Sequence, residues 1–103
     1  MIKIKLCNIN DLRIGERRKF KLNDNEILLI RLKDGFYVME NRCPHAGCRL
    51  SYYGKIFEDG RIVCTCHGAI FSLKDGRALD GPTQKPLKLY RVKIVEDQVF
   101  LET

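Results

Sequence analysis

The sequence predicts an all-β protein, built as a small antiparallel β-barrel or sandwich. Across its 103 residues, alternation of apolar and polar side chains and turn-forming dipeptides dominate, and no segment keeps a helical period. The dipeptide Asp-Gly, which favours tight hairpin turns, marks predicted turns at 34–35, 59–60 and 75–76. About nine short strands at this spacing are typical of a small barrel or sandwich.

Each strand is predicted from its own pattern. At the N-terminus, Ile2, Ile4 and Leu6 alternate with other residues, as in a strand with one buried face. Further strands are expected at 17–22, 26–32, 36–40, 55–58, 61–64, 89–95 and 99–103. The polar turns Asn-Asp-Asn at 23–25 and Glu-Asp-Gln at 96–98 join neighbouring strands.

Size and composition fit one globular domain that spans residues 1–103. Hydrophobic residues make up 45% of the chain and charge is mixed, which argues against disorder. The longest aliphatic run, at 27–30, is far shorter than the roughly 20 residues that a membrane helix requires. The alternating N-terminus does not have the pattern of a signal peptide. We therefore expect a soluble, cytoplasmic protein without a membrane anchor.

The formal net charge of +6 suggests three kinds of partner: nucleic acid, an anionic membrane or an acidic protein. The 19 Lys and Arg residues are scattered, and the only basic run is Arg17-Arg18-Lys19. No basic patch is interleaved with aromatic residues, and no nucleic-acid-binding motif is present, so we expect no nucleic acid partner. A solvated basic surface and a docking face for an acidic protein both remain open.

The two histidines of the chain each lie beside a cysteine, in the motifs Cys43-x-His45 and Cys64-x-x-His67, with 18 residues between them. Cys43 follows the predicted strand 36–40 and Cys64 ends the predicted strand 61–64, so each starts a loop where a rigid scaffold can aim side chains at a shared ion. Two thiolates and two imidazoles match the ligand set of one type of [2Fe–2S] cluster. Structural zinc is the alternative, although C-x-H is tighter than the usual spacing of roughly two to four residues.

Residues 43–51 and 64–68, with the sequences CPHAGCRLS and CTCHG, resemble the two cluster-binding loops of Rieske proteins. The resemblance extends from about residue 36 to the C-terminus. It includes Gly81-Pro82, which is similar to the proline-bearing loop beside the cluster in that family. It implies a barrel or sandwich of Rieske type, with the two cluster-binding loops carried on β-hairpins.

The resemblance also implies one [2Fe–2S] cluster per chain and assigns its ligands. Cys43 and Cys64 would hold the inner iron, and His45 and His67 would hold the outer, more exposed iron. Because both histidines are used, none remains for the separate mononuclear iron site of a Rieske oxygenase. We therefore expect no catalytic residues in this chain.

The remaining cysteines are Cys7, Cys48 and Cys66. In the branch of the family that includes the cytochrome bc complexes, cysteines at the last two positions form a disulfide, which the resemblance implies here. Two reduced thiols are the alternative, which the cytosol ordinarily favours. Cys7 is expected to be a small buried hydrophobic residue rather than a reactive thiol.

The chain departs from that branch at Ala69 and Phe71. High-potential members of the family have a serine and a tyrosine there, whose hydroxyls donate hydrogen bonds to cluster sulfur. Such donors stabilise the reduced, more negative form. Without them, we expect a midpoint potential in the lower half of the family range of about −150 to +300 mV.

The function implied by the resemblance is that of a soluble electron carrier rather than an enzyme. It would transfer one electron between a reductase and an acceptor oxidoreductase, docking an acidic face of its redox partners beside His45 and His67. A second hypothesis is a tightly bound Rieske small subunit of an oxidoreductase complex, of nitrite-reductase, arsenite-oxidase or oxygenase type. A structural zinc-binding module is the third.

Overall fold

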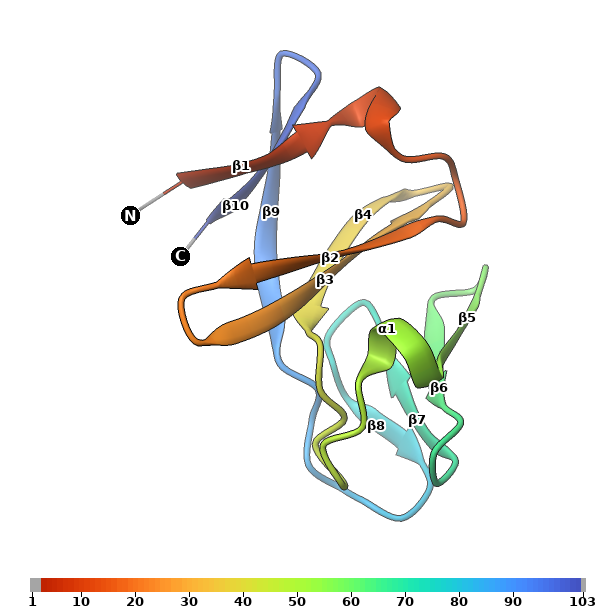
Figure 1. Cartoon of the computed structure of the whole chain (residues 1–103). Coiled ribbons are helices and arrows are strands. Elements are labelled where there is room, and N and C mark those ends of the chain that lie inside the picture. The colour runs from red at the N-terminus through yellow and green to blue at the C-terminus, as the bar shows by residue number, and fades with distance from the viewer. Residues whose placement is uncertain (1–2, 103) are drawn as a thin grey trace.

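The computed structural model describes residues 3–102, which form two antiparallel sheets and one short helix (Figure 1). In chain order the elements are β1 (Lys3–Asn8), a 3₁₀ turn (Ile9–Asp11), β2 (Arg17–Leu22), β3 (Asn25–Leu32), β4 (Gly35–Glu40), α1 (Leu50–Tyr53), β5 (Gly54–Phe57), β6 (Arg61–Cys64), β7 (Ala69–Ser72), β8 (Ala78–Asp80), β9 (Leu89–Val95) and β10 (Gln98–Glu102). No helix among these residues is long and apolar enough to cross a membrane.

The larger sheet has six strands in the order β1-β10-β9-β4-β3-β2, and the smaller sheet has four in the order β5-β6-β7-β8. Every pairing is antiparallel, and most link strands that follow one another in the chain. The predicted all-β class is therefore confirmed. The predicted strand residues Ile2 and Thr103 lie outside the described part of the chain.

β3 is buried on both faces, because the sheets enclose it from both sides. Its residues 27–30 are each at most 1% exposed. Since successive side chains of a strand point to opposite faces, this aliphatic run supplies two cores at once. One core lies within the larger sheet and contains Cys7, Leu12, Ile27, Leu29, Val38, Val99 and Leu101. The other lies between the sheets and contains Leu28, Ile30, Leu32, Met39, Cys43, Leu50, Ile62, Cys64, Ala69, Phe71, Leu73 and Leu87.

A half-buried arginine also joins the larger sheet to α1. The guanidinium of Arg17 on β2 donates hydrogen bonds to the carbonyl oxygens of Leu50, at 3.0 Å, and Gly54, at 2.6 Å. These carbonyls lie at the two ends of the helix, so one side chain from β2 fixes its position. Burial lowers the pKa of Arg17 from its ordinary value, but an arginine remains charged at neutral pH.

Cys7 lies in the core of the larger sheet and is 5% exposed, which confirms the prediction that it is a buried residue. Burial raises the pKa of its thiol, and the carboxylate of Asp11 raises it further, whereas Arg18 and Lys5 act in the opposite direction. The thiol therefore stays protonated in the folded chain at neutral pH.

Replacing Leu28 tests the core between the sheets. We expect Leu28→Ala to lower the free energy of unfolding by about 2–5 kcal/mol, because the fully buried side chain leaves a cavity. Leu79→Ala is the matched control: this leucine is 41% exposed, and its loss should change stability by no more than about 0.5 kcal/mol. Denaturant unfolding of both variants measures the difference, and equal effects would contradict the assigned core.

The raised pKa of Cys7 predicts a loss of stability at alkaline pH. As the pH rises past the ordinary thiol value of 9.0, the unfolded chain loses the Cys7 proton while the folded chain retains it. Stability then falls with pH, by at most about 1.4 kcal/mol per pH unit from this group. When unfolding is measured from neutral to alkaline pH, the free energy of unfolding should fall less steeply for Cys7→Ala than for the wild-type chain. Parallel curves would refute the raised pKa of Cys7.

Candidate metal centre

Three loops meet at the end of the molecule away from the two chain termini (Figure 1). We call them loop 1 (residues 41–49, between β4 and α1), loop 2 (65–68, between β6 and β7) and loop 3 (81–88, between β8 and β9). Loop 3 approaches loop 2 so closely that a Cβ on Gly81 would lie 2.8 Å from the carbonyl oxygen of Gly68. All the predicted ligands lie in loops 1 and 2 or at the end of β6.

Loops 1 and 2 each contain the same type of backbone hydrogen bond, which runs from a glycine amide to a cysteine carbonyl. The amide of Gly47 donates to the carbonyl of Cys43, and the amide of Gly68 donates to the carbonyl of Cys64, both at 2.8 Å. The two glycines have φ angles of 75° and 82°, in the left-handed region that favours glycine. In each case the turn starts at a cysteine carbonyl and is closed by a glycine four residues later.

The predicted ligands lie in two pairs of opposite exposure. Cys43 and Cys64 are 2% and 1% exposed, and both belong to the core between the sheets. His45 and His67 are exposed, with ring centroids 4.9 Å apart and ring planes 81° apart. The chain therefore provides two sulfur donors inside the core and two imidazole donors at the surface.

Burial raises the pKa of the Cys64 thiol, and the neighbouring Cys43 thiol raises it further. The backbone N–H groups of Cys66 and His67, which hydrogen-bond to the Cys64 sulfur, act in the opposite direction. These N–H groups face a sulfur that becomes a thiolate when it binds a metal, so part of its charge is stabilised in advance. Ala69 and Phe71 are fully buried nearby and provide no side-chain donor.

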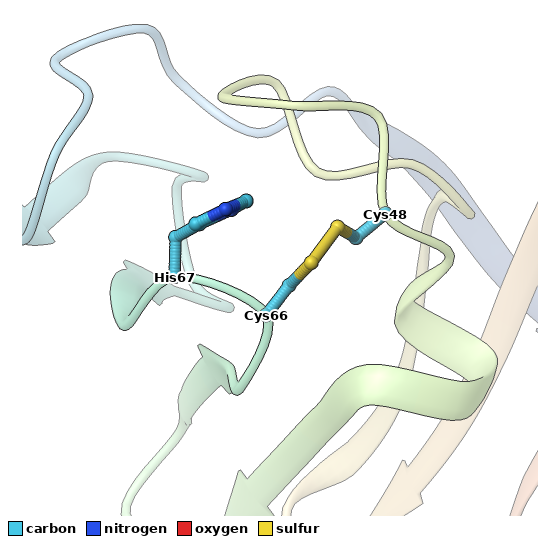
Figure 2. A group of neighbouring side chains, drawn as sticks. All are labelled: Cys48, Cys66 and His67. Carbon is cyan, nitrogen blue, oxygen red and sulfur yellow. A yellow bond between two sulfur atoms is a disulfide. The ribbon is translucent and has the colours of Figure 1, made fainter.

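A disulfide joins loop 1 to loop 2 through Cys48 and Cys66, as the family resemblance implied (Figure 2). On an entropic model, a bridge with a sequence separation of 18 contributes about 3 kcal/mol. Among the described residues, these two sulfurs and His67 are the one group of three candidate donors within 4.8 Å of one another. Because sulfurs in a disulfide are not thiolates, this group does not form a metal site.

The arrangement suits two metal ions better than one. A tetrahedral zinc ion requires four donors around a single point, whereas the described chain brings no such set of free thiols and imidazoles together. Two buried thiols and two exposed imidazoles, held by two bridged loops, provide two separate ligand pairs. The donor chemistry therefore fits a [2Fe–2S] cluster with two cysteine and two histidine ligands.

Two polar residues that the sequence did not single out close the base of loop 1. The amide of Asn41, which is 3% exposed, donates to the Ser51 hydroxyl at 2.9 Å. Its oxygen accepts the backbone N–H of Ser51 at 2.6 Å. The pair holds the two ends of the loop together directly beside Cys43. In the sequence, Asn41 resembles any polar residue after a strand, so only its burial reveals its role.

The three loops carry positive charge and no carboxylate. Their basic side chains, all exposed, are Arg42, Arg49, Lys85 and Lys88. Of these, Arg49 lies 3.4 Å from Glu26 on β3. The loops themselves therefore present only cations, which attract an anionic partner, whereas Asp24, Glu26 and Glu40 line the recess beside loop 1.

The chain matches the family model of the Rieske [2Fe-2S] domain over residues 2–91. It is 32% identical over 98 residues to the "Biphenyl 2,3-dioxygenase, ferredoxin component" of Rhodococcus jostii, covering 95% of this chain and 90% of that protein. It is 30% identical to the human protein "Apoptosis-inducing factor 3", covering 93% of this chain. This chain spans only 16% of the length of the human protein.

Solved structures show the same fold. The "Ferredoxin of carbazole 1,9a-dioxygenase from Nocardioides aromaticivorans IC177" superposes with a TM-score of 0.88 and 22% identity, covering 98% of this chain and 97% of that one. A chain of the "Complex of reduced oxygenase and oxidized ferredoxin in carbazole 1,9a-dioxygenase" gives a TM-score of 0.87 and 28% identity, covering 97% of this chain and 92% of that one.

Removing the Asn41 side chain tests how loop 1 is held. We expect Asn41→Ala to lower the free energy of unfolding by about 1–3 kcal/mol, because the part-buried N–H of Ser51 loses its partner. Asn10→Ala, at an exposed position in the 3₁₀ turn, is the control and should be close to neutral. Thermal unfolding of the two variants compares them. If Asn41→Ala is also neutral, the pair does not hold the loop.

Proposed function

Because the chain belongs to the Rieske [2Fe–2S] domain family, we propose that it is a soluble, cytoplasmic electron carrier, with residues 1–103 forming one domain. It would take one electron from a reductase and pass it to an acceptor oxidoreductase. Its cofactor is a [2Fe–2S] cluster, which when bound supplies a one-electron couple. The observation that carries the proposal is the pairing of two buried thiols with two exposed imidazoles at the ends of bridged loops.

Four residues would hold the cluster, in two roles. Cys43 and Cys64, within the core, would bind as thiolates shielded from water by the surrounding aliphatic side chains. His45 and His67 would bind as imidazoles at the surface, where a partner protein can approach them directly. An electron carrier requires this asymmetry, since one side of the centre is protected and the other is accessible.

The names of similar proteins support redox partners of this kind. A relative from Xanthobacter autotrophicus, 28% identical, is the "Alkene monooxygenase system, ferredoxin component". One structural neighbour is a ferredoxin in complex with an oxygenase. We infer that this chain also docks a reductase and an acceptor, and that the basic side chains of loops 1 and 3 favour acidic faces on both.

Ligand substitutions test the proposed centre. We expect Cys43→Ser and His67→Ala to lose or grossly alter the visible absorption and the iron content of the protein, because each removes one donor. Cys7→Ala is the matched control, since this cysteine lies in the core of the larger sheet. This variant should keep the visible absorption and the iron content of the wild-type protein.

Absorption spectra, with iron and acid-labile sulfide measured per chain, read out the result. A normal spectrum from either ligand variant would refute the assignment. One zinc per chain in a colourless wild-type protein would instead support the structural zinc module.

A further inference from the structure

The short helix α1 ends in two exposed tyrosines. Tyr52 is 81% exposed, the most exposed large apolar side chain in the described part of the chain, and Tyr53 is 39% exposed. Their rings contact each other edge to face, with centroids 4.8 Å apart and planes 83° apart. The Tyr52 ring in particular is open to solvent, and large apolar groups gain free energy when a partner covers them.

The two rings form one wall of a shallow recess of about 530 Å³. Lys19 from β2, Arg49 from loop 1 and Ser51 complete its lining. Aromatic faces flanked by cations are typical of the surfaces at which proteins recognise other proteins, because tyrosine and arginine provide large contact areas together with polar groups.

Hydrogen bonds and chain connectivity join this surface to the two loops of the candidate metal centre. The carbonyl of Tyr53 accepts hydrogen bonds from the backbone N–H of Thr65, at 2.9 Å, and from its hydroxyl, at 2.8 Å. Thr65 directly precedes the bridged Cys66 in loop 2. On the other side, Arg49 directly follows the bridged Cys48 in loop 1. The helix that carries the tyrosines is therefore joined to both bridged loops, and these loops contain His45 and His67.

The charges around the recess select an acidic partner. Lys19 lies 3.9 Å and Arg49 lies 3.4 Å from the carboxylate of Glu26, so two cations face one anion and the site remains net positive. Loops 1 and 3 add further basic side chains and no carboxylate. A nearby acidic surface gains attraction from this distribution, whereas a basic surface is repelled.

We propose that Lys19, Arg49, Tyr52 and Tyr53, together called the α1 patch, anchor the acidic face of a redox partner during electron transfer. This inference rests on the proposed carrier function and deepens it, since it places the docking surface to one side of the two histidines. The rings of Tyr52 and Tyr53 would be covered by apolar groups of the partner, while Lys19 and Arg49 contact its carboxylates. Tyrosine suits this role because its rigid ring loses little conformational entropy on binding.

Electron transfer to plastocyanin, an acidic copper protein, tests the α1 patch. In each encounter the reduced holoprotein gives one electron to Cu(II), which becomes Cu(I), and stopped-flow absorption follows the second-order rate. We expect Tyr52→Ala to slow this rate by about fivefold or more, as for truncation of an interface hot spot. Lys19→Glu should also slow it and weaken its dependence on ionic strength.

Controls lie late in β9, which leads to the β9–β10 turn at the end of the molecule away from α1 (Figure 1). Ile94 is 43% exposed, and Lys93 beside it is exposed. Lys93→Glu therefore repeats the change of charge elsewhere, and Ile94→Ala removes another exposed apolar side chain. Both controls should keep the wild-type rate within about twofold. All four variants should keep the wild-type midpoint potential and visible spectrum, because none alters the proposed ligands.

The inference is overturned if Tyr52→Ala transfers electrons at the wild-type rate. It is also overturned if Lys93→Glu slows transfer as much as Lys19→Glu, because net charge alone would then explain the effect. A wild-type protein that has no reversible one-electron couple at all would overturn the carrier function itself, and that result is visible before any variant is compared.

Discussion

The burial of β3 on both faces is the constraint on which the rest of the structure depends. The run at residues 27–30 sends Ile27 and Leu29 into the larger sheet and Leu28 and Ile30 toward the smaller one. Each fully buried aliphatic side chain contributes about 1.5–3 kcal/mol, so neither core is stable if β3 is displaced. The core between the sheets also contains Cys43 and Cys64. The thiols of the metal centre are therefore positioned by the same packing that joins the two sheets.

The same backbone arrangement in both loops separates the cysteine ligands from the histidine ligands. Each cysteine lies where a strand or loop leaves the core, and the backbone turns outward until a glycine closes the loop. The thiols stay shielded and the imidazoles reach the surface. The disulfide holds the two loops to each other, Asn41 closes the base of loop 1, and Arg17 fixes the helix that follows it. These polar contacts are few, but each joins segments that are distant in sequence.

Strands with clear alternation and polar turns could be predicted from sequence, and the bounds of β2, β6 and β9 agree with the prediction. The helix α1 could not be predicted, because a single helical turn is too short to show a periodic pattern. Its position also depends on Arg17, which is distant in sequence. The candidate ligands stood out because cysteine and histidine are rare and adjacent here. The roles of Asn41 and Tyr52 could not be predicted, since one is defined by burial and the other by exposure, and both follow from tertiary packing.

The most direct test of the account is an anaerobic redox titration of the holoprotein, followed by visible absorption and by electron paramagnetic resonance that detects nitrogen ligands. We expect one electron per chain, nitrogen coupling from two imidazoles, and a midpoint in the lower half of about −150 to +300 mV. A colourless protein would contradict the account. So would a couple near −400 mV without nitrogen coupling, which is the behaviour of a cluster held by four thiolates.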